Sequence, residues 1–117
     1  MAIRSRDKGA RFERQLASRF REYGYTARRS AQYCGNTGEA ADVVGLPGIH
    51  IEAKHQERMS LYDWMAQAKR DAGNTGKLPA VFHKKNHAEI LVTMEFEDFM
   101  QIYREWAAGF DWGEVDG

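Results

Sequence analysis

Two parts of the chain are predicted to be helices, one from the spacing of its apolar residues and the other from a capping sequence at its N-terminus. In residues 7–23 the apolar side chains fall on one face, at Phe12, Leu16, Phe20 and Tyr23. Asp7 is suited to the N-cap of this helix, and Gly24 is suited to its end. Residues 60–72 begin with "SLYD", which has the form of a capping box and predicts a second helix.

A third helical pattern, in residues 95–107, has a stripe of aromatic residues. The stripe consists of Phe96, Phe99, Tyr103 and Trp106. An apolar stripe on a helix normally faces the interior of a domain, so we expect these rings to pack against the core. We assign residues 1–106 to a single domain and residues 107–117 to an acidic C-terminal tail.

Five segments between these helices have the composition of strands, and Gly, Pro and Asn residues separate them. The predicted strands are residues 25–32, 42–45, 49–55, 78–85 and 88–94. The order is helix, three strands, helix, two strands, helix. It predicts one compact α/β domain with a mixed central sheet flanked by helices.

The composition is that of an ordinary globular domain. The chain has 117 residues, of which 43% are hydrophobic and 29% are charged. No apolar run approaches the roughly 18 residues that a membrane span needs. The single cysteine, Cys34, cannot form an internal disulfide, which suits a reducing compartment. We therefore expect an intracellular, cytoplasmic protein without a membrane partner.

Charge is distributed unevenly, although the formal net charge is zero. Residues 1–29 hold nine Lys or Arg against three acids, and residues 95–117 hold seven acids against one arginine. The basic N-terminal part predicts a face that binds phosphates. A solvated helix face accounts for the same charges equally well, so charge alone leaves both interpretations open.

The segment "GIHIEAKH" places a charged pair in the most strand-like part of the chain. If the preceding hairpin is centred on Pro47, Asp42 lies directly opposite Glu52. Alternation places Lys54 on the same face, and the predicted site depends on this register. His50 shares the face as well. Because it is a lone histidine, it is interpreted as a neighbour of the site and not as a ligand.

Two adjacent carboxylates repel each other unless a proton or a cation lies between them. Their oxygen atoms suit a hard cation such as Mg²⁺ or Mn²⁺. A lysine beside such an ion can orient water and balance charge while a phosphodiester is attacked. The alternative is a surface ion pair between Glu52 and Lys54 without a catalytic role. The acid across the turn, Asp42, weighs against that alternative.

The ordered series of short motifs resembles the PD-(D/E)XK nuclease family. Asp42, a hairpin and then "EAK" match its motif, although Ala41 stands where the motif has proline. "KGARFER" and "RRSA" resemble segments of the archaeal-type Holliday-junction resolvase branch, which includes phage relatives. The resemblance covers about residues 8–106, and it implies a restriction-endonuclease-like αβββαβ core.

The resemblance also implies a divalent metal ion, Mg²⁺ with Mn²⁺ as a substitute. Its ligands would be Asp42, Glu52, the main-chain carbonyl of Ala53 and, directly or through water, Glu13. Lys54 would position the attacking water, and Ser30 would assist at the scissile phosphate. The residues implied to contact DNA are Arg14, Arg28, Arg29 and Gln67. For Gln67, an exposed helix position without a role is the alternative.

The implied function is structure-selective cleavage of DNA, with paired cuts that resolve four-way (Holliday) junctions in recombination. Two symmetric cuts imply a homodimer. Its predicted surface is made of apolar residues of the second helix and the final strands, with the regions around Trp64 and Phe82. The loop of residues 31–40 is a candidate DNA clamp. Two alternatives stay open. One is a nicking or restriction-type nuclease on duplex or branched DNA, and the other is a non-catalytic DNA-binding module on the same fold.

Overall fold

The structure is a computed structural model that describes residues 5–30 and 41–110. Its elements follow the predicted order, and they are α1 (Ser5–Glu22), β1 (Arg28–Arg29), β2 (Val43–Val44), β3 (Ile49–His55), α2 (Leu61–Ala72), β4 (Leu78–Lys84), β5 (Leu91–Met94) and α3 (Phe96–Ala108). The three helices agree closely with the predicted ranges. The first two strands are shorter than predicted, since only their central residues pair within the described part of the chain.

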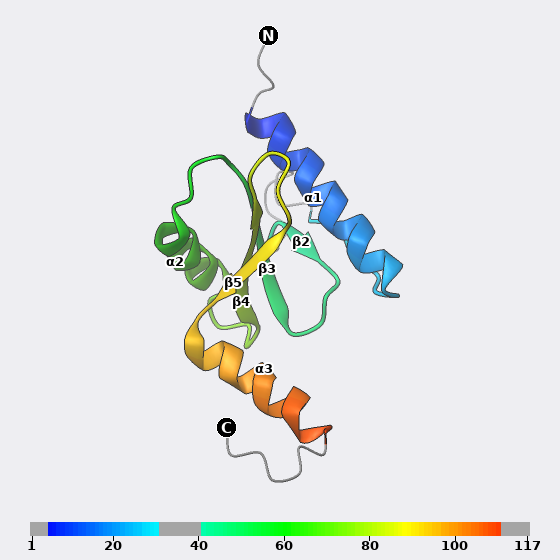
Figure 1. The fold of residues 1–117 in the computed structure, drawn as a ribbon, viewed down its shortest axis with the longest axis vertical. Coiled ribbons are helices and arrows are strands. Elements are labelled where there is room, and N and C mark those ends of the chain that lie inside the picture. The colour runs from blue at the N-terminus through cyan, green and yellow to red at the C-terminus, as the bar shows by residue number, and fades with distance from the viewer. Residues whose placement is uncertain (1–4, 31–40, 111–117) are drawn as a thin grey trace.

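The five strands form one sheet in chain order, β1-β2-β3-β4-β5. Neighbouring strands pair antiparallel except β3 and β4, which are parallel. Parallel neighbours need a crossover connection, and α2 provides it. Figure 1 shows α1 and α2 on the two sides of the sheet. The predicted α/β fold, a mixed central sheet flanked by helices, is confirmed.

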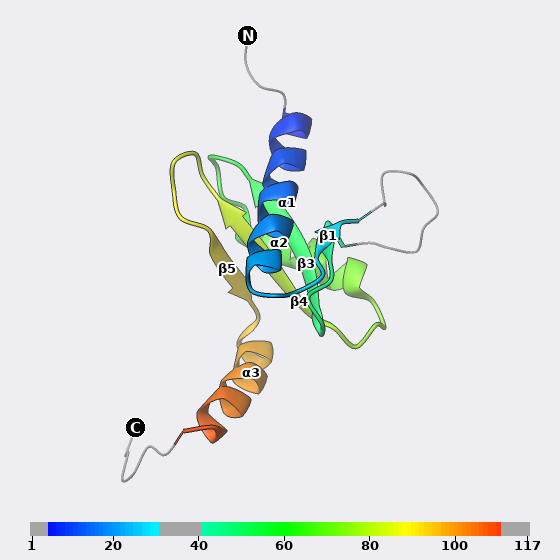
Figure 2. The ribbon, with the colours of Figure 1, turned by 90° about the vertical axis from the view of Figure 1, so that its right-hand side faces the viewer.

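α1 and α2 cover opposite faces of the sheet (Figures 1 and 2). On one face Phe12 of α1 belongs to a buried cluster with Ile51 of β3. On the other face Trp64 of α2 packs with Val81 of β4. Ile51 and Ala53 of β3 face α1. Because side chains alternate along a strand, Glu52 between them faces α2.

Trp64 and Phe82 are core residues. Their exposed fractions are only 6% and 9%, and the ring of Phe82 makes an edge contact with Phe20 of α1. These two side chains therefore cannot form a dimer surface, because each of them holds a helix of its own chain against the sheet. Other apolar residues of the second helix and the final strands are exposed, among them Tyr62, Leu91 and Val92.

The hairpin between β2 and β3 turns at Leu46, Pro47 and Gly48, as the sequence predicts. Gly45 precedes this turn with a φ of 106°, a conformation that favours glycine. A Cβ atom at this position would collide with the main chain of Thr26. Glycine therefore allows the hairpin to lie directly against the segment that leads into β1.

α3 leaves the sheet after β5 and extends away from it (Figures 1 and 2). Its aromatic stripe is present, but none of the residues of this helix is buried, and Phe96 is 70% exposed. The prediction that the stripe packs against the core is wrong, because the helix points away from the sheet and no face of the sheet lies beneath it. Among the described helices, none is long and apolar enough to cross a membrane.

Candidate active site

Asp42 is held against β3 by two hydrogen bonds. Its amide donates to the carbonyl oxygen of Ile51 (2.9 Å), and the amide of Ala53 donates to its Oδ2 atom (2.8 Å). Val43 pairs with Ile51, which is the register predicted for the hairpin. The amide of Asp42 nevertheless donates to Ile51, which is already the partner of Val43, and not to Glu52. Asp42 is therefore shifted from the predicted position directly opposite Glu52.

Glu52 points from the middle of β3 into the α2 side of the sheet, and only 2% of it is exposed. Burial raises the pKa of its carboxyl above the ordinary value, and the contact with His50 opposes this rise. The negative charges of Asp42 and Asp71 raise the pKa further, so both acids lie within electrostatic reach of Glu52. A cation at this position would favour the ionised form.

Glu13 approaches the same region from α1. Burial raises the pKa of Glu13, and the charge of Asp42 raises it as well. Nε of Arg29 donates a hydrogen bond to Oε1 of Glu13 (2.9 Å), and this contact lowers the pKa in turn. Glu13 therefore lies within electrostatic reach of Asp42. Arg29, which the resemblance assigns to DNA, is bound to a carboxylate of the site in this structure.

Lys54 is bound to Gln67. Its Nζ atom donates to Oε1 of Gln67 at 3.1 Å, which joins β3 to the middle of α2. The charge of Lys54 also lowers the pKa of Glu52, so the ammonium group lies near the buried carboxylate. The interpretation of Gln67 as an exposed glutamine without a role does not fit this contact.

The remaining predicted residues lie around these groups. Ser30 is buried, and its amide donates to the carbonyl oxygen of Asp42 (3.0 Å). Arg14 and Arg28 are exposed, and Nη1 of Arg28 donates to the carbonyl oxygen of the next residue (3.2 Å). The candidate DNA clamp, residues 31–40, lies outside the described residues.

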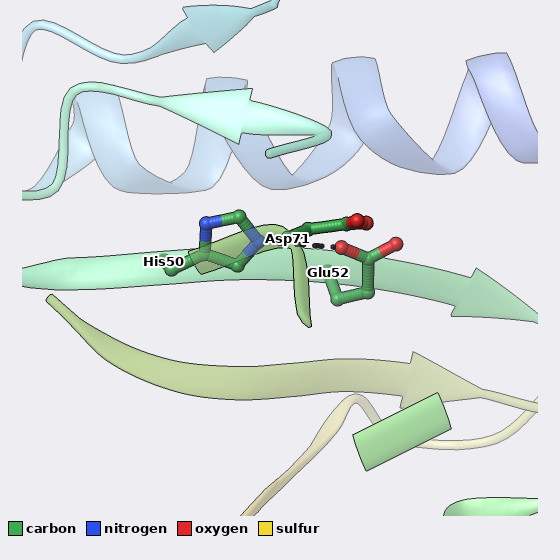
Figure 3. Close-up of side chains that lie close together, drawn as sticks. All are labelled: His50, Glu52 and Asp71. Atoms are coloured by element: carbon green, nitrogen blue, oxygen red, sulfur yellow. Dashed lines mark ion pairs between the residues drawn. The ribbon is translucent and has the colours of Figure 1, made fainter. Parts of the chain in front are cut away.

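Two further residues lie beside Glu52, and the sequence analysis did not assign them to the site. Figure 3 shows His50, Glu52 and Asp71 with their polar ends turned toward one another. One ligand atom from each residue lies within 4.8 Å of the others. His50 shares a strand face with Glu52, and this was the only signal for it in the sequence. Asp71 follows Gln67 by one helical turn on α2, which places both on one face of the helix.

The site therefore combines carboxylates from four elements with one lysine. α1 contributes Glu13, and the residue before β2 contributes Asp42. β3 contributes Glu52 and Lys54, and α2 contributes Asp71 at the edge of the group. Closely spaced carboxylates are costly to ionise together, and a divalent cation relieves that cost. The arrangement can hold such an ion beside an ammonium group.

Comparisons with known proteins identify the family. Residues 4–112 match the family model described as "Phage putative PDDEXK endonuclease". The solved structure of a Holliday junction resolvase from the archaeal hyperthermophile Archaeoglobus fulgidus is similar, with 27% sequence identity and a TM-score of 0.56. The similarity covers 74% of this chain and 72% of that one. No curated protein matches the sequence. Because the family model matches nearly the whole chain, the protein belongs to the phage endonuclease family of PD-(D/E)XK nucleases.

Proposed function

We propose that this nuclease is a Mg²⁺-dependent endodeoxyribonuclease that resolves four-way DNA junctions by paired phosphodiester hydrolysis. The observation that carries the proposal is that Asp42 lies within electrostatic reach of both Glu13 and Glu52, and that Lys54 lies within reach of Glu52. The similarity to an archaeal Holliday junction resolvase supports the choice of substrate. We expect the enzyme to act on DNA in the cytoplasm.

The residues of the site fit a divalent metal ion. Oε1 of Glu52 is buried and has no hydrogen-bond partner within the described residues, so this carboxylate lacks a compensating contact that a bound cation would supply. Asp42, Glu52 and the main-chain carbonyl of Ala53 would hold Mg²⁺ or Mn²⁺, with Glu13 directly or through water. When bound, such an ion neutralises phosphate charge and makes water more acidic.

Lys54 supplies the positive charge that the chain itself brings to the reaction. Its hydrogen bond to Gln67 restrains a side chain that is otherwise long and flexible. Held in this way, the ammonium group would orient the attacking water and stabilise charge on the phosphate oxygens. Gln67 acts in this scheme through Lys54 and is a positioning residue. Ser30, which lies next to Asp42 through the main chain, would assist at the scissile phosphate.

DNA would approach over the arginines near the site. Arg14 and Arg28 are exposed, and Arg29 is the arginine that reaches Glu13. Contacts of this kind bind the phosphate backbone and do not distinguish one base sequence from another. The described part of the chain is small and has no separate element for reading bases, which favours selection of a DNA shape over a sequence.

Paired cuts need two sites, so we propose that two copies of the chain form a symmetric dimer through α3. Its stripe leaves large apolar side chains in water: Phe96, Phe99, Ile102, Tyr103, Trp106 and Phe110. Leu91 and Val92 of the neighbouring strand are also exposed. A cavity of about 390 Å³ with an apolar lining adjoins the start of this helix, between Met65 and Phe96. A second copy is the occupant that would both cover this surface and supply the second site.

The test compares substrates and metal conditions in one assay. A labelled four-way junction, a linear duplex and single strands are incubated with Mg²⁺ or with chelator. The wild-type protein is compared with Glu52→Gln and with Glu89→Gln, which makes the same chemical change at an exposed position that is not assigned to the site. We expect metal-dependent paired cuts on the junction from the wild type and from Glu89→Gln, and none from Glu52→Gln.

The same assay separates the alternative functions. Cutting of every substrate would identify a general nuclease, and a single cut per molecule of duplex or branched DNA would identify a nicking enzyme. Binding of the junction without any cut in Mg²⁺ or Mn²⁺ would leave a non-catalytic DNA-binding module. Each of these three results would overturn junction resolution.

A further inference from the structure

His50, Glu52 and Asp71 form a cluster on the α2 side of β3, away from the main-chain contact between Asp42 and Ala53. His50 and Glu52 are successive residues on one face of β3, and Asp71 lies in the last turn of α2. Figure 3 shows the imidazole and the two carboxylates converging on a common position. One ligand atom from each residue lies within 4.8 Å of the others, so small rotations of the side chains bring all three onto a single ion.

Two of these side chains are buried without the hydrogen bonds that burial normally requires. His50 is 4% exposed and Glu52 is 2% exposed. Nε2 of His50 and Oε1 of Glu52 have no hydrogen-bond partner among the described residues. These two atoms lie 3.4 Å apart, close enough to attract but without the alignment of a hydrogen bond. Buried polar atoms of this kind need a ligand, because leaving them unpaired is costly.

The chemical types of the three coordinating atoms indicate which cation would bind between them. A nitrogen and two carboxylate oxygens form a mixed set, whereas Mg²⁺ prefers oxygen ligands and water alone. Imidazole together with carboxylates suits divalent transition metals. The two acids would neutralise the charge of the ion, and the neutral imidazole would donate its free electron pair to it. A proton shared between His50 and Glu52 would leave Asp71 without a role in the cluster.

We propose that His50, Glu52 and Asp71 bind a divalent transition-metal ion, Zn²⁺ or Mn²⁺, at a second cation site that shares Glu52 with the proposed Mg²⁺ site. Asp42 and Ala53 approach Glu52 from the β2 side, and His50 and Asp71 approach it from the α2 side. The ion would fasten the last turn of α2 to the centre of the sheet. It would also fix the orientation of the carboxylate that the reaction needs.

The test measures binding of the metal itself in the absence of DNA. Isothermal titration calorimetry with ZnCl₂ and with MnCl₂ is carried out on the metal-free protein, and thermal unfolding is followed with and without each ion. With ZnCl₂ we expect one high-affinity ion per chain and a higher Tm, whereas Mn²⁺ should also bind at the proposed Mg²⁺ site. His50→Gln and Asp71→Asn should each weaken binding by at least about tenfold, since each removes one ligand. Asp63→Asn, an exposed change on the same helix, should bind as the wild type does.

A fourth variant distinguishes failure of the second cation site from failure of the proposed nuclease function. The second site rests on the nuclease proposal only through the shared Glu52. Asp42→Asn should lose DNA cleavage and keep the Zn²⁺ affinity, because all three donors of the second site remain. Equal affinity in the wild type, His50→Gln and Asp71→Asn would show that the ion binds elsewhere and would overturn the second site. Absence of binding in the wild type would overturn it as well. If His50→Gln does not fold, Asp71→Asn at the half-buried helix position gives the same comparison.

Discussion

The carboxylate of Asp42 accepts a hydrogen bond from the main-chain amide of Ala53, 2.8 Å away and one residue beyond Glu52. This contact fixes the position of one acid against the strand that carries the other, without any bond between the two acids. Asparagine at position 42 keeps an oxygen for the Ala53 amide and removes the negative charge. It therefore separates the structural contribution of Asp42 from its electrostatic one.

We expect Asp42→Asn to lower the rate of DNA cleavage by about a hundredfold or more, because the proposed metal site loses a charged ligand. The free energy of unfolding should change by less than about 1.5 kcal/mol, since the hydrogen bond remains possible. Single-turnover cleavage and urea unfolding measure the two effects. Asp42→Ala, the comparison, should lose both activity and stability. Cleavage by Asp42→Asn at the wild-type rate would exclude a role for this charge.

Gln67 should influence the reaction through Lys54. We expect Gln67→Ala to lower the single-turnover rate by about tenfold, because the ammonium group loses the contact that restrains it. Gln67→Glu should recover most of the rate, since its carboxylate can accept the same hydrogen bond. Gln101→Ala, an exposed change on α3, serves as the control. Failure of Gln67→Glu to recover any activity would mean that the amide contacts DNA itself.

The buried Glu52 should make stability depend on pH in a defined direction. Because burial raises its pKa above the ordinary 4.5, the folded protein holds this proton more tightly than the unfolded chain does. The protonated group contributes its full stability below about pH 4.5, the ordinary pKa. This contribution is lost as the pH rises through the raised pKa of the folded state. With chelator present, the free energy of unfolding of the wild type should therefore fall relative to Glu52→Gln as the pH rises.

Urea unfolding at a series of pH values measures this difference. Adding Mg²⁺ or Mn²⁺ should reverse the loss in the wild type at high pH and have little effect on Glu52→Gln. A difference between the two proteins that rises with pH would contradict the direction of the pKa shift.

Arg28 and Arg29 are adjacent but should behave differently when they are replaced. Arg28 is exposed, so Arg28→Gln should weaken DNA binding and reduce the slope of log affinity against log salt by about one. Arg29 is bound to Glu13, so Arg29→Gln should also lower the cleavage rate at saturating protein. Binding titrations at several salt concentrations and single-turnover rates distinguish the two effects. Equal cleavage rates for the two variants would show that the contact with Glu13 has no catalytic consequence.

The α3 stripe should control the assembly of the protein. We expect Trp106→Glu to convert a dimer into a monomer, because a charge in a buried apolar interface is costly. Gln101→Glu, on the opposite side of the same helix, should remain a dimer. Analytical ultracentrifugation measures the mass, and a doubly labelled junction shows whether one strand or both strands are cut. A wild-type protein that sediments as a monomer would exclude a dimer through this surface.

Local patterns in the sequence predicted much of the fold. Alternation in "GIHIEAKH" and the turn at Pro47 gave the hairpin register that places Val43 against Ile51. The shift at Asp42 was not predictable, because it depends on the Ala53 amide and not on any sequence period. Apolar spacing identified α3 as amphipathic, but spacing carries no information about what covers the apolar side.

Part of the candidate site could be predicted from the sequence and part could not. Glu52 and Lys54 are two residues apart, so strand alternation alone places them together. Asp71 joins them only because α2 crosses over to the parallel strand β4 and packs on that face of the sheet. A contact that depends on tertiary packing of a helix leaves no local trace in the sequence.

The acids of the site come from α1, the residue before β2, the middle of β3 and the last turn of α2, and they have no shared stretch of chain. Before the first helix has docked on the completed hairpin, these groups are far apart and cannot act together. A nascent or partly unfolded chain should therefore be unable to hydrolyse DNA. For a nuclease built in this way, the folding of the chain determines when hydrolysis can begin.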